Sequence, residues 1–279
     1  MGAVRHLGWD IGPRHNTLIE VPRELYDQFQ VRPLRALRDL AAVPSFAIDP
    51  WDPDGPLRRE QANPERSHPL GEASITVKGK RYYFSRNFVC KPDDTASRWV
   101  HVDLALNRDC CGFAMVHLKP VYFEFPLPLG GSERRPRVVI DLMLRIAAEP
   151  GKHIEFEQVR ERIYELSYRG FNIGGVSYDG WQSVDSLQIL GAKGYRVELY
   201  SVDKTTEAYE CLLEYMRTEG AIDYYPFEPF FEEWQALELV DGKKVDHPPK
   251  GSKDVTDAVA GAVWMATQMI AGEGEIMFV

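Results

Sequence analysis

Three aspartates each stand as the only charge in a run of apolar and neutral residues. They are Asp103 in WVHVDLALN, Asp179 in FNIGGVSYDGWQSV and Asp257 in VTDAVAGAVWMATQMIAG. Segments of this composition are normally buried, and burying a lone carboxylate is costly unless a cation or a hydrogen-bond donor meets it. The three residues need one shared explanation, and a metal site is the simplest one.

Composition restricts the class of protein. With 279 residues, 44% of them hydrophobic, the chain can form one large domain or one domain with an appendage. Four cysteines without a CxxC pair indicate a reduced, intracellular protein and give no zinc spacing. The formal charge of −9 argues against a surface coated in basic charge, but it does not exclude a nuclease that holds DNA with a local patch.

The sequence shows no membrane or targeting segment. No apolar run reaches the roughly 18 to 20 residues that a membrane helix needs. The start of the chain, MGAVRHLGWDIGPRH, lacks the continuous apolar core of a signal peptide. We therefore expect a soluble protein without a membrane partner.

The first part of the chain differs in texture from the rest. The stretch Ala47–Leu70 is dense in Pro, Asp and Arg, and we expect it to be an irregular connector. Before it, apolar residues between Glu24 and Leu40, interrupted by Pro33, predict two short helices or one broken helix. We predict an N-terminal extension over residues 1–95 and one catalytic domain over residues 96–279.

From Trp99 onward the pattern becomes regular. Aliphatic residues at 100, 102, 104 and 106 alternate with His101 and Asp103, which predicts a strand with Asp103 on the face opposite the aliphatics. Further strands are predicted over 112–117, 137–145, 172–177 and 195–200, and helices over 156–169, 183–190 and 205–217. This order predicts an α/β fold with a mixed sheet covered by helices.

Two of the isolated aspartates have predicted positions in this pattern. Asp179 directly follows a strand, where the carboxyl ends of strands in α/β sheets present catalytic groups. Asp257 lies in the first turn of a helix that runs to about Ala271 and has one broad apolar face. On that helix, Asp257, Gly261 and Trp264 are expected on the side away from the apolar face.

The motifs around the aspartates resemble a known family: the nuclease domain of the large terminase subunit of tailed double-stranded-DNA bacteriophages, which has an RNase H-like fold. The resemblance covers about Trp99 to Ala271 and runs through HVDLALNRDCCGFAM, VSYDGWQSVDSLQILGAKGY and KVDHPPKGSKDVTDAVAGAVW. It implies an RNase H-like mixed sheet flanked by helices. It also implies a metal-dependent endonuclease that cuts concatemeric viral DNA during genome packaging with little sequence specificity.

The resemblance also assigns roles to the acids. Asp103 matches the first-strand aspartate that bridges two Mg²⁺ or Mn²⁺ ions, Asp179 the acid of the second motif, and Asp257 the acid that opens the C-terminal helix. Asp109 matches an additional acid near the site, or it is an ordinary turn aspartate. Asp254 either shares the site, because residues i and i+3 lie on one helical face, or favours the helix terminus as a cap.

Basic residues near these motifs have two interpretations each. Lys253 either meets a phosphate or stabilises the clustered acids, or it is an exposed lysine. Arg134, Arg135 and Arg137 are predicted in a flexible loop that either grips the DNA backbone or is merely solvated. His247, before Pro248, is expected to be a surface residue with at most a minor role.

The partners implied by the resemblance are double-stranded DNA, an ATPase motor, the portal and the small terminase subunit, in the host cytoplasm. No GxxxxGKS or GxxxxGKT motif of a P-loop ATPase occurs in the chain, so the motor is either part of a longer protein or a separate polypeptide. Two alternative functions remain: another RNase H-like nuclease of the resolvase or transposase type, and a catalytically inert module that binds DNA or protein.

Overall fold

The computed structural model describes residues 23–26, 50–70, 77–78, 84–104, 110–127, 129–148, 151–180, 183–240, 242–248 and 251–273. Contacts divide the chain into two units, Met1–Asp49 and Pro50–Val279. The first unit contains the 3-10 helix η1 (Arg23–Leu25), and most of the predicted helical segment between Glu24 and Leu40 lies outside the described residues. The predicted boundary near residue 95 stays a prediction.

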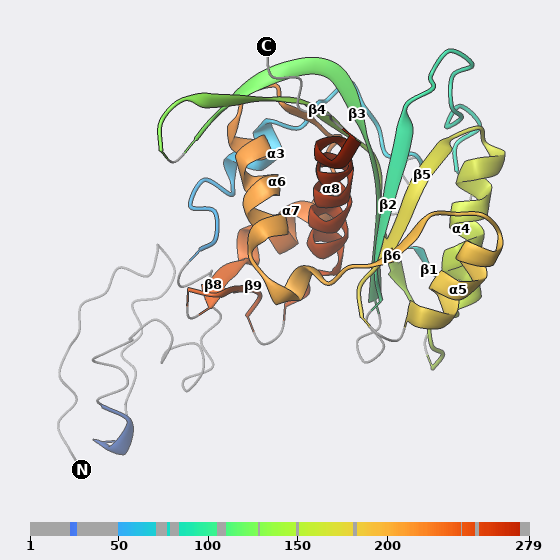
Figure 1. The fold of residues 1–279 in the computed structure, drawn as a ribbon. Coiled ribbons are helices and arrows are strands. Elements are labelled where there is room, and N and C mark those ends of the chain that lie inside the picture. Colours follow the sequence, from blue (N-terminus) through green and yellow to red (C-terminus); the bar gives the residue numbers. More distant parts are fainter. Residues whose placement is uncertain are drawn as a thin grey trace. The chain divides into compact units, whose positions relative to one another are not determined.

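A mixed sheet forms the centre of the second unit (Figure 1). Its strands are β1 (Val77–Lys78), β2 (Ser97–Leu104), β3 (Cys110–Pro126), β4 (Ser132–Ala147), β5 (Asn172–Tyr178), β6 (Val197–Leu199) and β7 (Ile222–Asp223). The strand order is β1-β4-β3-β2-β5-β6, and β7 also pairs with β4. The strands β2, β3 and β4 run antiparallel to their neighbours in that set, whereas β5 is parallel to β2 and β6 is parallel to β5.

Helices cover both faces of the sheet (Figure 1). One face carries α4 (Phe156–Tyr168) and α5 (Val184–Ala192), and the other carries α6 (Glu207–Arg217), α7 (Glu228–Ala236) and α8 (Asp254–Glu273). Smaller elements are α3 (Leu57–Glu60), η3 (Val202–Lys204) and a two-stranded sheet of β8 (Glu238–Val240) and β9 (Lys244–Asp246). The predicted α/β class with a mixed sheet flanked by helices is confirmed. The elements α7, β7, β8 and β9 were not predicted.

Alternate side chains of β2 enter two different cores. Val100, Val102 and Leu104 belong to the cluster that contains Val159 and Ile163 of α4. His101 lies on the opposite face, against α8, and Asp103 is the next residue on that face. Because helices cover both faces, both alternating sets are withdrawn from water. The face predicted for Asp103 is confirmed.

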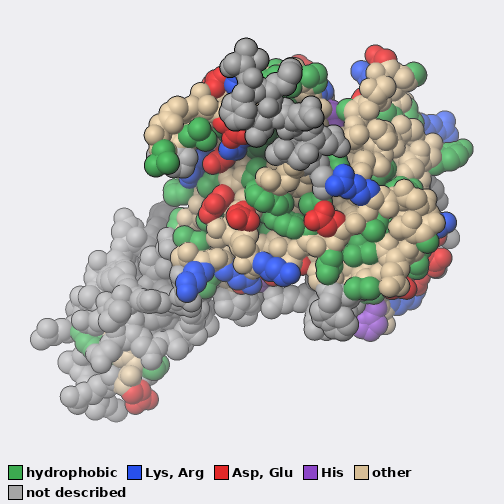
Figure 2. Space-filling view, in the orientation of Figure 1, with side chains coloured by type: hydrophobic (Ala, Val, Ile, Leu, Met, Phe, Trp, Pro, Cys, Tyr) green, Lys and Arg blue, Asp and Glu red, His purple; other side chains and the backbone are tan. Residues whose placement is uncertain are grey.

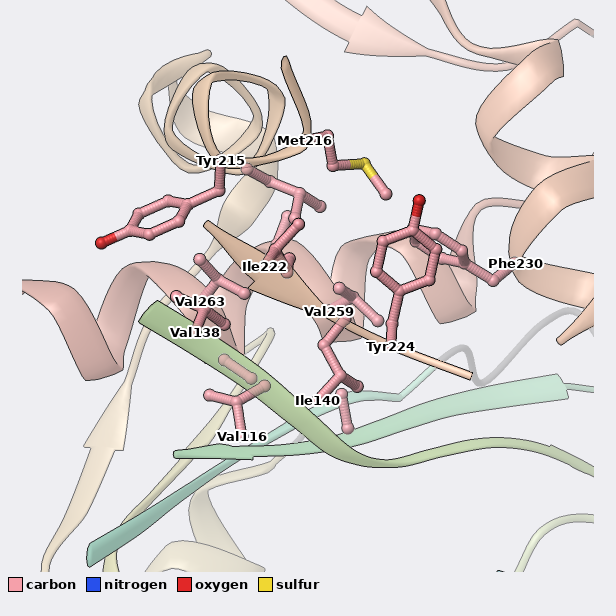
Figure 3. Packing of buried hydrophobic residues seen from close by; sticks show 14 of the residues in the cluster. Val116, Val138, Ile140, Tyr215, Met216, Ile222, Tyr224, Phe230, Val259 and Val263 are labelled. Atoms are coloured by element: carbon pink, nitrogen blue, oxygen red, sulfur yellow. The ribbon is translucent and has the colours of Figure 1, made fainter. Parts of the chain in front are cut away.

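The second core lies between the sheet and the three helices on the α8 side. Figure 3 shows Val116, Val138 and Ile140 of the sheet packed with Val259 and Val263 of α8. Tyr215 and Met216 of α6 belong to the same cluster and cover it from the side away from the sheet. The helix α8 is therefore enclosed between the sheet and the other helices.

This enclosure corrects the expected orientation of α8. Asp257 and Gly261, predicted on a side away from the apolar face, are buried, and Asp257 is 3% exposed. A Cβ atom at Gly261 would lie 2.3 Å from Cδ2 of His101, and one at Gly112 of β3 would lie 1.7 Å from the Asp254 carbonyl oxygen. The sequence prediction was wrong for these two residues because Gly261 faces His101 of the sheet and Asp257 contacts Tyr209 of α6. The two glycines permit the close approach of α8 to the sheet.

The strands β3 and β4 continue as a long hairpin beyond β2. Beyond the end of β2, strand residues from Lys119 onward in β3 pair only with β4, and Glu124 lies opposite Arg134. The loop predicted over PLPLGGSERRP is wrong in extent, because Arg134, Arg135 and Arg137 lie in β4. The alternating residues from Val121 to Phe125 supply a partner strand, and the turn contains Gly130 and Gly131 with φ angles of 92° and 87°.

The described part of the predicted connector, residues 50–70, packs within the second unit. It is irregular in its described part apart from α3, as predicted. Arg58 forms a buried ion pair with Asp52, with 2.7 Å between Nε and Oδ2, and the Trp234 indole N–H donates to Asp52 at 3.0 Å. These contacts attach the connector to α7.

Candidate functional site

Asp103 and Asp179 lie beside each other at one end of the sheet. Asp103 is next to the last residue of β2 and pairs with Gly112 of β3. Asp179 directly follows β5, and its N–H donates to the Val102 carbonyl at 2.9 Å. The alternation along both strands places the two side chains on the face that α8 covers. The predicted position of Asp179 after a strand is confirmed.

The N-terminus of α8 adds two further carboxylates at this end of the sheet. Asp254, the first residue of α8, contacts β3 through its backbone at Gly112. Asp257 lies one turn later and is buried, whereas Asp254 is partly exposed. The close backbone contact at Gly112 therefore brings the acids of α8 to the end of β2 that carries Asp103.

Three neighbouring carboxylates act on Asp103. Burial raises the pKa of Asp103 well above its ordinary value, and the charges of Asp257, Asp254 and Asp179 raise it further, while Lys253 acts in the opposite direction. Like charges at short range disfavour ionisation of every member of a cluster. A cation placed among these acids would reverse this effect.

Asp257 is held by two donors from different elements. The Tyr209 hydroxyl of α6 donates to Oδ1 at 2.5 Å, and Lys253 Nζ donates to Oδ2 at 2.7 Å. Lys253 Nζ also donates to Oδ1 of Asp203 in η3 at 2.5 Å. Burial raises the pKa of Asp257 to about 6, against the opposing effect of Lys253 and Tyr209. Burial alone would lower the pKa of Lys253, but Asp257 and Asp203 hold it above its ordinary value.

Lys253 therefore fits the interpretation that it stabilises the clustered acids. It is 6% exposed and contacts the clustered acids, so the prediction of an exposed lysine is wrong. Its partners Asp203 and Tyr209 were not identified from the sequence. Neither residue lies in a motif around the isolated aspartates, and a contact between distant segments leaves no local pattern.

The cap of α8 is Glu233 of α7 and not Asp254. Oε2 of Glu233 accepts the N–H groups of Val255 and Thr256 at 2.9 and 3.0 Å, and Oε1 accepts the Ser252 hydroxyl at 2.9 Å. The carboxylate of Asp254 has its hydrogen bond from Ser252 at 2.8 Å. Burial raises the pKa of Glu233 to about 8, while the Thr256 N–H lowers it. Because Glu233 satisfies the first free amides of the helix, Asp254 is available for another role.

The remaining predicted site residues lie elsewhere or outside the described part. Asp109 lies outside the described residues. His247 is partly buried and its charge lowers the pKa of Asp254, so it is near the site, with Nδ1 2.7 Å from the Pro248 carbonyl oxygen. A minor role for His247 stays a prediction.

Of the three predicted DNA-binding arginines, Arg134 and Arg135 lie towards the turn of the β3–β4 hairpin, whereas Arg137 pairs with Lys119 nearer the middle of β3. Arg134 is paired with Glu124, twelve residues along β3 from Gly112, which corresponds to about 40 Å of strand. Arg134 also lies 3.6 Å from the Glu124 carboxylate, and Arg135 forms ion pairs with Glu133 and Glu214. Arg134 and Arg135 are therefore remote along the strand from Asp103, and both are already paired with acids.

The donor set at the end of the sheet suits a hard divalent cation, since carboxylate oxygens are the ligands that Mg²⁺ and Mn²⁺ prefer. Within the described residues, however, no three His, Cys, Asp or Glu side chains stand in an arrangement ready to hold a metal ion. Both oxygens of Asp257 accept hydrogen bonds, one from Tyr209 and one from Lys253. The residues fit a cation in chemistry and charge, with one ligand engaged by a lysine.

No protein-family model and no curated protein matches the sequence. Among solved structures, the chain is similar to the large terminase nuclease from thermophilic phage G20c, with 14% identity, a TM-score of 0.49, and coverage of 74% of this chain and 94% of that one. The same nuclease with bound magnesium gives 15% identity, a TM-score of 0.46, and coverage of 72% and 98%. The large terminase of the HK97 bacteriophage gives 12% identity, a TM-score of 0.44, and coverage of 62% and 40%.

These solved proteins are of the kind that the sequence motifs resemble. None of the helices in the described part of the chain is long and apolar enough to span a membrane.

Proposed function

We propose that this chain is a metal-dependent endonuclease that hydrolyses double-stranded DNA. The observation that carries the proposal is the convergence of Asp103, Asp179, Asp254 and Asp257 from two strands and a helix, where three of the acids raise the pKa of the fourth. A group of carboxylates in this state is stabilised by divalent cations. Phosphodiester hydrolysis with two cations needs such a group.

The proposed ligands are the residues that the sequence indicated. Asp103, Asp179 and Asp257 would hold two Mg²⁺ or Mn²⁺ ions, with Asp254 and Asp109 as additional ligands. When bound, such ions lower the pKa of water and stabilise the leaving oxygen of the phosphodiester. The chain itself fixes the acids: the N–H of Asp179 bonds to β2, Glu233 holds the start of α8, and the Tyr209 hydroxyl orients Asp257.

The biological setting is proposed from the motif resemblance. The chain would cut concatemeric viral DNA during genome packaging, with little sequence specificity, in the host cytoplasm. Its partners would be an ATPase motor, the portal and the small terminase subunit. The motor would belong to another part of a longer protein or to a separate chain.

The surface near Lys253 is a better candidate for the DNA backbone than the three arginines of the hairpin. Figure 2 shows Lys and Arg side chains along the lower edge of the drawn face, where Figure 1 places β8 and β9. Lys204 of η3 and Lys243, which precedes β9, are exposed, and Lys244 Nζ lies 3.6 Å from Asp203 Oδ1. Asp203 in turn contacts Lys253, so this basic edge adjoins the carboxylates. Exposed lysines bind phosphates without reading sequence.

Incubation of supercoiled plasmid with the purified chain tests the proposal. Nicking and linearisation are expected with Mn²⁺ or Mg²⁺ and not with EDTA. Asp103→Asn serves as the control for a contaminating nuclease. Cleavage that persists in chelator, or that Asp103→Asn retains in full, would refute the metal-dependent mechanism. Equal cleavage of linear and branched DNA would argue against a resolvase.

A further inference from the structure

Lys253 bridges two acids that differ in their surroundings. Its Nζ lies 2.7 Å from Oδ2 of Asp257 and 2.5 Å from Oδ1 of Asp203. The side chains of Lys253 and Asp257 are 8% and 5% exposed, whereas that of Asp203 is 45% exposed. The ammonium group therefore has one buried partner, inside the carboxylate cluster, and one partner at the surface.

The buried partner is the acid that a cation would need. Oδ1 of Asp257 accepts the Tyr209 hydroxyl, so Oδ2 is the oxygen that faces the lysine. Lys253 and Asp257 are four residues apart around the first turn of α8, and the lysine stem can rotate without moving the helix. Asp203 comes from η3, a separate element, and would keep its contact after such a rotation.

We propose that Lys253 is a resident counter-ion that occupies Asp257 in the metal-free protein and exchanges with a divalent cation. On cation binding, Lys253 Nζ leaves Oδ2 of Asp257 and remains with Asp203. Lys253 is thus a positioning residue that sets the affinity of the cluster for cations. Asp203 lowers the free-energy cost of the exchange, because it keeps an ion pair with Lys253 after the ammonium group leaves Asp257. The inference rests on the proposed metal site.

The negative charge of the carboxylate cluster explains why the metal-free protein needs a counter-ion. Without a cation, Asp103, Asp179, Asp254 and Asp257 would repel one another, and Lys253 supplies one compensating charge. With a divalent cation present, an ammonium group at Asp257 would repel the ion. Asp203 resolves this conflict by holding the ammonium group at the edge of the site, next to Lys244.

Isothermal titration with Mn²⁺ tests the exchange without measuring cleavage. Lys253→Gln removes the competing cation and is expected to tighten Mn²⁺ binding by about tenfold. Asp203→Asn removes the surface partner, so Lys253 stays on Asp257 and Mn²⁺ binding weakens by about fivefold. Lys244→Gln is the matched control: it removes a positive charge that contacts Asp203 but does not contact Asp257, and it should not tighten binding.

The double variant Lys253→Gln/Asp203→Asn distinguishes an exchange of Lys253 from a general change in the electrostatic potential at the site. If Asp203 acts through Lys253, Asp203→Asn has almost no effect on Mn²⁺ affinity in the Lys253→Gln background. Additive effects of the two substitutions, or tightening by Lys244→Gln equal to that by Lys253→Gln, would overturn the proposal. Thermal unfolding gives a second readout: Lys253→Gln should lower the midpoint in EDTA and recover it in Mn²⁺, whereas a purely structural lysine would lower it equally in both.

Two outcomes distinguish this inference from the function on which it rests. Absence of Mn²⁺ binding to the wild-type chain would refute the proposed metal site itself. Normal Mn²⁺ binding and cleavage by the wild-type chain, with additive variants, would refute the exchange alone. If Lys253→Gln folds poorly, Asp203→Asn still tests the proposal, because it leaves Lys253 and the four acids of the cluster in place.

Discussion

At the scale of single residues, the site is defined by carboxylates whose negative charges are only partly balanced by positive ones. Burial and three neighbouring acids raise the pKa of Asp103, while Asp257 is the acid that Lys253 and Tyr209 bind directly. The isolated acids in the sequence indicated that something must compensate them. Stabilisation of the clustered acids was one of the interpretations of Lys253, and the structure places its ammonium group on Asp257.

Asp103→Asn tests the central acid. We expect cleavage of plasmid to be lost, because a neutral amide is a poor ligand for a hard cation. The free energy of unfolding in EDTA should stay the same or rise, since the substitution removes one like charge from the cluster. Urea denaturation in EDTA measures the second effect. A folded variant with wild-type cleavage would contradict the role of Asp103.

At the scale of elements, α8 is positioned by contacts that its own sequence does not reveal. Its N-terminus is capped by Glu233 from α7, and its close approach to β2 depends on Gly261. Both contacts join segments far apart in the chain. The site is therefore sensitive to residues that do not touch the acids.

Gly261→Ala should lower the free energy of unfolding by about 1 to 3 kcal/mol, because the new methyl group would overlap the buried His101 ring. Gly191→Ala in α5 is the matched control. Its Cβ would lie 3.5 Å from the nearest atom, a Val197 methyl, and alanine raises helix propensity by about 1 kcal/mol over glycine. Urea denaturation of both variants measures the difference. Destabilisation by Gly191→Ala as large as that by Gly261→Ala would show that helix glycines matter for another reason.

Glu233→Ala and Asp254→Ala compare the observed cap with the expected one. Glu233→Ala should cost about 2 kcal/mol of stability, because it leaves the N–H groups of Val255 and Thr256 without their buried acceptor. Asp254→Ala should cost much less, since its carboxylate caps neither amide. Thermal unfolding in EDTA checks the order. A larger loss of stability in Asp254→Ala than in Glu233→Ala would show that Asp254 caps the helix.

The sequence predicted some elements well for physical reasons. The alternation in β2 and the helical spacing of Phe156, Val159, Ile163 and Leu166 are local patterns, and both elements are found. The length of the β3–β4 hairpin and the environment of α8 were missed, because prolines and glycines suggested a loop and one apolar face suggested a solvent side. The structure brings together the acids that the sequence analysis proposed, Asp103, Asp179, Asp254 and Asp257. Their neighbours Asp203, Tyr209 and Glu233 come from distant segments and were not proposed.

At the scale of the whole molecule, the acids tie stability to pH and to cations. The pKa of Glu233 is raised to about 8 and that of Asp103 well above its ordinary value, both chiefly by burial. A folded state with raised carboxyl pKa values binds more protons than the unfolded state, so stability falls as pH rises through the folded values. Buried His101, with a pKa lowered to about 3, acts in the opposite direction, but this effect is complete by about pH 7.

In EDTA, the free energy of unfolding should therefore fall between about pH 7 and pH 8.5, on the order of 1 kcal/mol for each pKa unit of one group. Saturating Mg²⁺ should reduce this fall, because a bound cation favours the ionised acids. Urea denaturation at both pH values, with and without Mg²⁺, provides the comparison. The same pH slope in both conditions would contradict a linkage between cation binding and the ionisation of these acids.

The position of α8 in the chain has a consequence for synthesis. This helix follows every strand of the central sheet in sequence, yet its acids lie beside Asp103 and Asp179. During translation the earlier segments emerge first and can begin to fold before later ones are available. A nascent chain carries Asp103 and Asp179 without the acids of α8. If the chain has the proposed activity, the ribosome would deliver it in an incomplete state, and nucleic acid near the ribosome would not be cut until α8 has been made and docked.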